Sequence, residues 1–148
     1  MDYEAVRHGL EQAIPYNRHL GLEVVDVGEG SGATRLPDDE RLQNHVGSQH
    51  AGALFSAGEA ASGAAFVGAF AERMGEITPL ARTAEISYLK LARGPITATG
   101  ALGGEKAALL ERLDADGKVE FPVEVQMTDA DGNTVASMTV HWHVRKNA

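Results

Sequence analysis

The sequence predicts an α+β protein of one domain, in which a curled antiparallel sheet wraps around one long central helix. The 148 residues match the size of a domain with a single core. Residues 50–74 are apolar on nearly every side, as is typical of a buried helix. Most of the segments that follow alternate apolar and polar residues, which is the period of half-buried strands. No regular crossover helices separate these strands, which argues against a doubly wound parallel sheet.

The elements expected before the long helix are a helix over residues 2–14, strands over 22–27 and 33–36, and a polar loop over 37–47. The first helix is amphipathic, with Asp2 suited to cap its start and Pro15 suited to end it. The glycine-rich segment 28–32 joins the two strands as a turn.

The elements expected after the long helix are strands over 83–88 and 96–102, a short helix over 105–113, and strands over 119–128 and 136–144. The strand from Val119 has the clearest alternation in the chain. Asp131-Gly132 predicts a hairpin turn between the last two strands.

Composition excludes several classes of function. The chain has no cysteine, which excludes disulfide scaffolds, thiolate nucleophiles and iron–sulfur clusters and is consistent with a cytoplasmic location. The net charge of -8 argues against nucleic acid as a partner. The N-terminus lacks the continuous apolar stretch of a signal peptide.

The apolar segment 51–71 reaches the length of a membrane span. It consists mostly of Ala, Gly and Ser, carries a carboxylate near its middle, and has neither an aromatic belt nor a flanking basic cluster. We therefore expect a helix enclosed by a sheet, and no membrane partner.

That carboxylate, Glu59, is the only charged side chain between Leu42 and Ala71. A carboxylate in apolar surroundings costs several kcal/mol unless it is paired, protonated or facing a cavity. A catalytic role is one explanation of its position. The alternative is structural: Glu59 pairs with an arginine such as Arg82, or reaches water at the edge of the helix.

The segment 44–52 leads into the long helix with polar residues and glycines. The first backbone N–H groups of a helix lack partners and lie at the positive end of its dipole. They are suited to stabilise an oxygen that gains negative charge, as in an oxyanion hole. The alternative is simple capping of the helix by Ser48, Gln49 or His50.

Ala51 and Glu59 are separated by about 12 Å along a helix, at about 1.5 Å per residue. One substrate carbonyl cannot contact both residues of the same chain. If two copies of the helix pack antiparallel across a two-fold axis, the helix start of one copy comes beside Glu59 of the other. Combining the two features predicts an obligate dimer with two composite sites.

The pattern Asn44-x-x-Gly47-x-x-His50-Ala51-Gly52 followed by Glu59 resembles the signature of hotdog-fold acyl-CoA thioesterases of the PaaI-like, phenylacetate-pathway type. In those enzymes an Asn, a His-Gly-Gly turn and a helix carboxylate occur at this spacing. The resemblance extends over residues 20–144, because the order of strands and helix also fits. It implies a hotdog fold and thioester hydrolysis without a metal or other cofactor.

The resemblance implies catalytic roles for four residues. Glu59 would be the general base for water, or the nucleophile, and the Ala51 N–H would polarise the thioester carbonyl. Asn44 would position water or substrate, and His50 would support the turn or touch the substrate. The family turn more often has glycine at Ala51, and its carboxylate is often aspartate. A backbone donor survives the first change where φ is negative.

The resemblance also implies residues that bind the substrate. Gly52 belongs to the turn, and Ser62 and Gly63 lie one turn beyond Glu59, near the same cleft. Lys90 and Arg93 end the strand where the family's basic residues often meet coenzyme A phosphates. The alternatives are close helix packing for Ser62 and Gly63, and solvated charges for Lys90 and Arg93.

The sequence therefore predicts an acyl-CoA thioesterase that acts as a homodimer or a dimer of dimers. One alternative is a non-catalytic acyl-CoA binder or sensor, which keeps the pocket without needing an ionised Glu59. A hotdog hydratase or dehydratase is less well supported, because the His and Asp/Asn arrangement of that branch is not evident. The acyl chain, and the choice between coenzyme A and a carrier protein, stay open.

Overall fold

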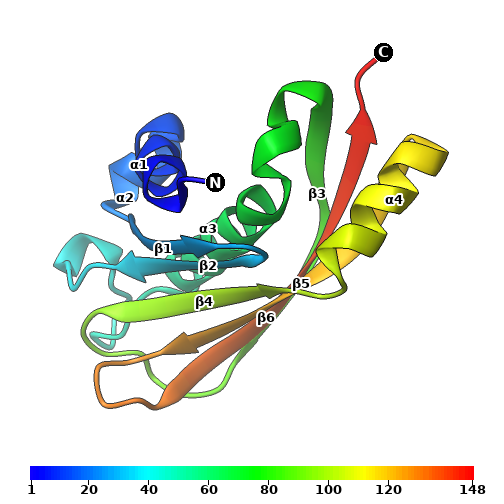
Figure 1. Ribbon diagram of the computed structural model, residues 1–148. Coiled ribbons are helices and arrows are strands. Elements are labelled where there is room, and N and C mark those ends of the chain that lie inside the picture. The colour runs from blue at the N-terminus through cyan, green and yellow to red at the C-terminus, as the bar shows by residue number, and fades with distance from the viewer.

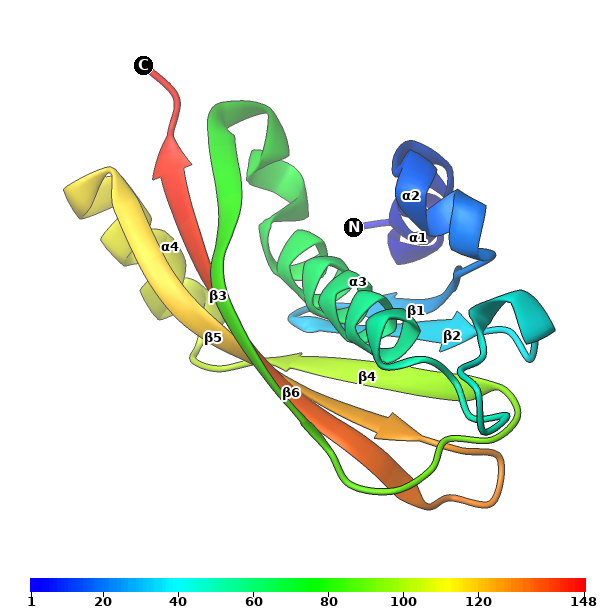
Figure 2. The same cartoon turned by 180° about the vertical axis from the view of Figure 1, so that it is seen from behind.

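The computed structural model describes residues 1–148. Its elements are, in order, α1 (Tyr3–Ala13), α2 (Pro15–Leu20), β1 (Glu23–Gly28), β2 (Ser31–Leu36), the 3-10 helix η1 (Glu40–Leu42), α3 (Ala51–Phe70), the 3-10 helix η2 (Ala71–Glu76), β3 (Ile77–Tyr88), β4 (Ile96–Leu102), α4 (Lys106–Asp116), β5 (Lys118–Thr128) and β6 (Thr134–Lys146). The strands form one sheet in the order β1-β2-β4-β5-β6-β3, and every neighbouring pair is antiparallel. The sheet curls around α3 (Figures 1 and 2), so the predicted fold class is confirmed.

The helix α3 forms the centre of the core, with 14 of its 20 residues buried. Its side chains are mostly small, so the sheet approaches the helix closely. At the end of α3, Phe66 and Phe70 stack with Phe121 of β5, and Phe66 also stacks on Trp142 of β6. The segment Ala51–Glu76 is long and apolar enough to cross a membrane, but most of it is buried here as the core helix of the fold.

Two glycines assigned to the β1–β2 turn have different roles in the structure. Gly30 adopts φ +81° and makes the turn. Gly32 instead lies in β2, where a Cβ would come within 2.5 Å of the Ala64 Cβ and 2.6 Å of the Ala65 backbone nitrogen. Gly32 is therefore explained by contact with α3, and the turn is shorter than the sequence predicted.

The strand β3 begins at Ile77, six residues before the expected start at Thr83. It lies at the edge of the sheet and bonds only to β6. Pro79 is compatible with this position because an edge strand leaves some N–H groups unpaired. Leu80 and Tyr88 are exposed on it, at 58% and 48%.

The N-terminal helices pack beside β1 and α3 at the margin of the sheet (Figure 1). Asp2 caps α1 by accepting a hydrogen bond from the Ala5 N–H at 3.1 Å. Pro15 begins α2 at the first helical position, where the missing N–H costs nothing. The sequence correctly ended the first helix before Pro15 but did not predict that a second helix starts there.

Apolar and polar contacts both attach these helices, although neither helix has a fully buried residue. Tyr3, Val6 and Leu10 of α1 pack against a buried cluster of Val24, Val27 and Ala64. Arg7 donates to the Val24 carbonyl at 2.8 Å, and Glu11 accepts from the Val24 N–H at 2.9 Å. Tyr16 Oη and Ser56 Oγ of α3 lie 3.0 Å apart; because Ser56 donates to the Gly52 carbonyl, Tyr16 is the donor. These bonds fix α1 to β1 and α2 to the central helix.

Candidate functional site

One face of α3 is left uncovered by the sheet. The six residues of α3 that are not buried are Ala51, Gly52, Phe55, Glu59, Gly63 and Val67. From Gly52 onward they recur at intervals of three or four residues, so they form a single stripe along the helix. We call this set the open stripe of α3. Glu59 lies in its middle.

Glu59 borders a cavity of about 250 Å³, which we call the Glu59 cavity. Its lining residues are Leu10, Ile14, Asn17, Val24, Glu59, Ala60, Gly63, Ala64, Phe66, Val67, Met74, Pro79 and Trp142. Most of them are hydrophobic, and apart from the Trp142 indole the polar side chains are Glu59 and Asn17. The cavity lies between α3, the N-terminal helices and the β3–β6 margin of the sheet. Sequence reasoning missed Asn17, because nothing in the sequence relates it to Glu59.

Glu59 makes no ion pair in the chain. The predicted alternative partner, Arg82, instead contacts Glu120 of β5 at 2.6 Å, so that explanation of Glu59 is wrong. Glu59 is half-buried, and burial raises the pKa of its carboxyl above the ordinary value of 4.5 because the charged form loses hydration. No cation offsets this effect. The side chain is therefore suited to accept a proton.

The raised pKa of Glu59 predicts a pH-dependent effect on stability. A carboxyl whose pKa is higher in the folded chain than in the unfolded chain stabilises the fold below the unfolded pKa, and that contribution is lost as pH rises through the folded pKa. Glu59→Gln should therefore raise the free energy of unfolding near pH 7 by about 1 kcal/mol. The gain should shrink as pH falls toward 4.5. Denaturant titrations of both proteins from pH 4 to 8 measure this difference, and a gain that is constant with pH would contradict it.

The loop before α3 is held by buried polar side chains. Ser48 Oγ contacts the Ala92 backbone, accepting from its N–H at 2.9 Å. Gln49 Nε2 donates to the carbonyls of Pro37 and Gly94, both at 2.9 Å. Ser48 and Gln49 therefore anchor the loop to its neighbours rather than capping α3.

The helix cap is His50, whose Nδ1 accepts a hydrogen bond from the Gly52 N–H at 2.8 Å. Because Nδ1 is the acceptor, the ring proton lies on Nε2. The sequence offered capping by His50 as an alternative to an oxyanion hole, and the structure shows this cap on the Gly52 N–H. The neighbouring Ala51 N–H has no hydrogen-bond partner within the chain. It is an exposed free donor at the start of a 20-residue helix.

Asn44 shapes the turn that precedes the helix. Its Oδ1 accepts hydrogen bonds from the Val46 N–H at 3.0 Å and the Ser48 N–H at 3.1 Å. Gly47, at φ +75°, completes the turn. The side-chain oxygen of Asn44 is thus occupied by the loop, whereas its Nδ2 makes no hydrogen bond within the chain.

Asn44 and Ala51 share a second, more open cavity of about 320 Å³, which we call the Asn44 cavity. Its lining residues are Asn44, Ser48, Gln49, Ala51, Leu54, Tyr88, Leu89, Lys90 and Leu91. Tyr88 donates from its hydroxyl to the Ala51 carbonyl at 3.1 Å, a contact that the sequence did not predict. The cavity therefore brings the end of β3 to the start of α3.

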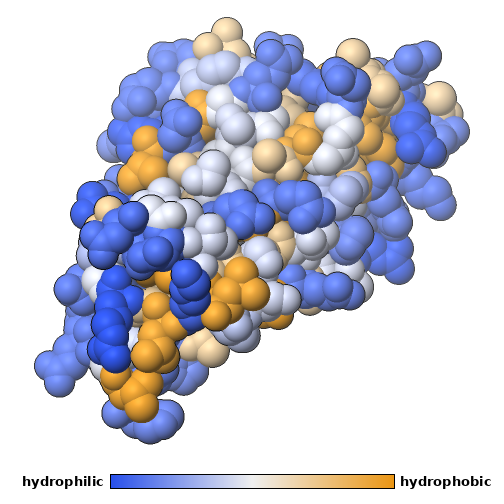
Figure 3. All heavy atoms as spheres, turned by 90° about the horizontal axis from the view of Figure 1, so that it is seen from below, coloured by the Kyte–Doolittle hydropathy of each residue, from blue (hydrophilic) through white to orange (hydrophobic).

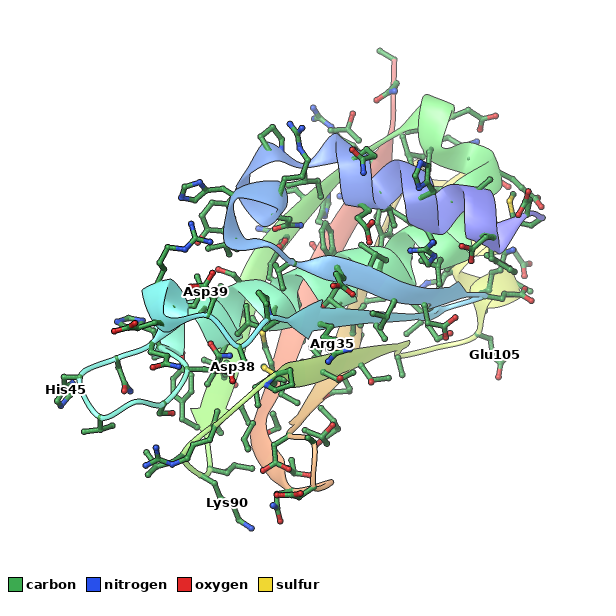
Figure 4. The ribbon with its side chains drawn as sticks, turned by 90° about the vertical axis from the view of Figure 1, so that its left-hand side faces the viewer. Arg35, Asp38, Asp39, His45, Lys90 and Glu105 are labelled. Carbon is green, nitrogen blue, oxygen red and sulfur yellow. The ribbon has the colours of Figure 1, made fainter.

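Lys90 lines this cavity and makes no ion pair, and Arg93 is also unpaired. Arg93 lies near the turn, since its Nη1 would be 3.5 Å from a Cβ at Gly47. In Figure 4 His45 extends outward at the left edge and Lys90 at the lower edge, both away from Glu105 on the right. Leu89 and Leu91 are more than half exposed. Seen from below, hydrophobic side chains are exposed between hydrophilic ones (Figure 3).

Ser62 and Gly63 differ in their surroundings. Ser62 is fully buried: its hydroxyl donates to the Glu59 carbonyl at 2.7 Å and accepts from Trp142 Nε1 at 3.2 Å. Ser62 thus faces the sheet and supports Trp142, whereas Gly63 lines the Glu59 cavity beside Glu59. The sequence predicted that Ser62 lies near the cleft, whereas the structure buries it as a packing residue against the sheet.

The two cavities have no lining residue in common. Within one chain, Glu59 is thus separated from Ala51, Asn44 and Lys90, which gather at the other end of the open stripe. A larger cavity of about 620 Å³ lies apart from both, lined mainly by charged side chains, and the Arg82–Glu120 ion pair borders it. Nowhere do three or more His, Asp or Glu side chains come together as a set of metal ligands.

The curled antiparallel sheet around one central helix defines a hotdog-fold protein. The chain belongs to the family described as a domain of unknown function, DUF4442, whose model matches residues 3–144. No curated protein matches it.

Comparison with solved structures also identifies the hotdog fold. PA5026 from Pseudomonas aeruginosa, a protein of unknown function described as a probable thioesterase, shares 29% identity, with a TM-score of 0.86 over 97% of this chain and 95% of that one. The PaaI protein of the E. coli phenylacetic acid degradation operon shares 19% identity, with a TM-score of 0.70 over 95% and 90%. The SAV0944 thioesterase of Staphylococcus aureus shares 15%, with a TM-score of 0.72 over 89% and 99%. The predicted resemblance to thioesterase-like hotdog proteins, including PaaI, is confirmed.

Proposed function

We propose that this protein is an acyl-CoA thioesterase that hydrolyses its substrate to a free acid and coenzyme A. The observation that carries the proposal is Glu59, a half-buried carboxylate without an ion-pair partner that borders an apolar cavity. Burying an unpaired carboxylate lowers stability, and a function at the site explains why the protein keeps it there. The descriptions of PA5026 as a probable thioesterase and of SAV0944 as a thioesterase support this choice.

The active site is proposed to be composite and to form in a homodimer. Ala51 and Glu59 lie about 12 Å apart along α3, too far for one carbonyl to reach both. Antiparallel packing of two open stripes would bring the Ala51 N–H of a second copy beside Glu59. The unpaired edge of β3, with Leu80 58% exposed, offers a surface for that second copy. Two such dimers would make the dimer of dimers.

In the proposed reaction, ionised Glu59 accepts a proton from a water molecule that attacks the carbonyl carbon of the thioester. The Ala51 N–H of the second copy donates to the carbonyl oxygen as negative charge develops there. Collapse of this intermediate breaks the carbon–sulfur bond and releases the coenzyme A thiolate, which takes up the proton held by Glu59 and so restores the ionised carboxylate. The variant mechanism is direct attack by Glu59, which forms a mixed anhydride that water then cleaves.

The remaining site residues are proposed to position the substrate. His50 holds the turn through Gly52 and presents Nε2–H outward. Asn44 has a free Nδ2 in the cavity that it shares with Lys90. Lys90 and Arg93 are proposed to attract the phosphates of coenzyme A, because neither cation makes an ion pair in this acidic chain. Asp129 is the carboxylate near Lys90, whose charge helps to lower the pKa of Asp129.

The proposal is tested by following thiol release from short, aromatic and long acyl-CoA esters with a thiol reagent. The protein contributes no background, because it has no cysteine. Turnover of at least one ester is the expected result. Binding without turnover across the panel would instead indicate an acyl-CoA binder or sensor, and neither binding nor turnover would refute the proposal.

Replacing Lys90 with glutamine should raise KM for an acyl-CoA ester about three- to tenfold and leave kcat unchanged, because an exposed cation contributes mainly to the encounter with phosphate. The effect should weaken in high salt, which screens exposed charges. Lys118→Gln is the matched control, since Lys118 is also unpaired but lies at the start of β5. Equal effects of the two substitutions would show that only net charge matters.

A further inference from the structure

Gly63 lies inside α3, and packing does not require a glycine at this position. Glycine costs about 1 kcal/mol relative to alanine at such a position. A Cβ at Gly58 would come within 2.6 Å of Met138 Sδ, and one at Gly68 within 2.0 Å of the Gly28 carbonyl oxygen. A Cβ at Gly63 would meet only Trp142 Cζ2, at an ordinary 3.8 Å, and the φ of Gly63 is not positive. The predicted alternative of close helix packing therefore does not explain Gly63.

Because Gly63 has no side chain, it leaves space in the Glu59 cavity. It lies one turn after Glu59 on the open stripe and lines the Glu59 cavity together with Trp142. From Glu59 to Val67 this cavity follows α3 for two turns, which is about 12 Å. Beyond Glu59 and Asn17 its walls are largely apolar. An apolar group that begins at Glu59 would therefore pass directly over Gly63.

The size of the cavity limits the group that it accepts. An apolar cavity of roughly 150 Å³ admits benzene, and the Glu59 cavity measures about 250 Å³. Met74 and Val67 line it beyond Gly63, and Leu10 and Ile14 of the N-terminal segment line it as well. The Arg7 and Tyr16 contacts to Val24 and Ser56 hold that segment in place.

We propose that the Glu59 cavity is the acyl pocket, that it takes an apolar acyl group of medium size, and that Gly63 sets its width. This inference rests on the proposed thioesterase function. It assigns the acyl group to the protomer that supplies Glu59, with the N-terminal helices as one wall. Coenzyme A then lies on the other side of Glu59, toward the Ala51 N–H of the second copy.

The test uses S-octyl-coenzyme A, a thioether that cannot be hydrolysed, with S-ethyl-coenzyme A as the short probe. Trp142 is the only tryptophan of the chain and lines the cavity, so its fluorescence reports occupancy. Gly63→Leu should weaken S-octyl-coenzyme A binding by about tenfold or more, because its side chain fills space that the octyl group needs. Binding of S-ethyl-coenzyme A should stay the same.

Gly63→Ala is the second variant, in case leucine disturbs folding, and should give a smaller loss with an increased Tm. Gly9→Ala is the matched control: Gly9 is an exposed glycine of α1 with no atom within 4 Å of a Cβ, so it gains helix propensity without touching the cavity. Unchanged octyl affinity in both Gly63 variants, or an octyl ligand that leaves Trp142 fluorescence unaltered, would overturn the pocket assignment.

Hydrolysis by the same proteins separates this inference from the function on which it rests. If the wild-type protein binds S-octyl-coenzyme A beside Trp142 but cleaves no ester, the proposed thioesterase activity is refuted and the assignment of the acyl pocket stands. Wild type that cleaves octanoyl-coenzyme A with a chain-length preference unaltered in Gly63→Leu would refute the pocket and keep the thioesterase.

Discussion

Glu59→Gln is expected to lower kcat for the best acyl-CoA ester by about two orders of magnitude or more, because the amide cannot accept a proton from water or attack the carbonyl. Glutamine preserves the shape of the side chain, so binding of S-octyl-coenzyme A should persist. Stopped or continuous thiol-release assays measure the loss. Turnover equal to that of wild type would remove Glu59 from the mechanism.

Glu105→Gln is the matched control for this substitution. Glu105 precedes α4, is exposed, makes no ion pair, and lies at the far end of the molecule from Lys90 (Figure 4). It removes the same charge without touching either cavity, so kcat should stay at the wild-type value. Glu59→Asp keeps a carboxylate but shortens its reach by one methylene, and its kcat should fall between those of the wild type and Glu59→Gln.

Gly68→Ala is expected to lower the free energy of unfolding by about 3 kcal/mol, at the upper end of what overpacking costs. Its Cβ would lie 2.0 Å from the Gly28 carbonyl oxygen and 3.1 Å from the Gly28 carbonyl carbon, so the backbone of β1 would have to move. Urea denaturation followed by circular dichroism measures the loss.

Gly63→Ala makes the same chemical change one and a half turns earlier in α3 and should raise stability by up to about 1 kcal/mol. The two alanine variants therefore should shift the urea midpoint in opposite directions. A loss of stability in both alanine variants would show that α3 tolerates no added methyl group, contrary to the space found at Gly63.

The sequence predicted most of the fold because elements that are buried on one face show a regular spacing of apolar residues. The strands β5 and β6 are covered on one face, so their alternation marked them clearly. The start of β3 was missed because residues 77–82 lie on an edge strand with several exposed positions, where burial imposes a weaker pattern. Gly32 was misassigned because a glycine that allows helix contact looks, in sequence, like a glycine in a turn.

The candidate site was predicted less completely, for a different physical reason. Glu59, Asn44 and His50 stand out by residue type and spacing. The assignment of Ser62 and Gly63 required knowing which way α3 is turned, and a helix that is apolar on all sides carries no such information. Asn17 and Tyr88 come to the site from elements distant in sequence, and only the tertiary structure places them there.

The division of α3 into 14 buried positions and six open ones affects how the protein can change over evolutionary time. At Gly58 and Gly68 a mutation that adds a methyl group strains the fold, so drift there is selected against. At Gly63 an added methyl group would meet only Trp142 Cζ2, at 3.8 Å, so a change there alters the Glu59 cavity with little strain on the sheet. A single substitution at Gly63 can therefore change the shape of the Glu59 cavity without compensating changes in the core.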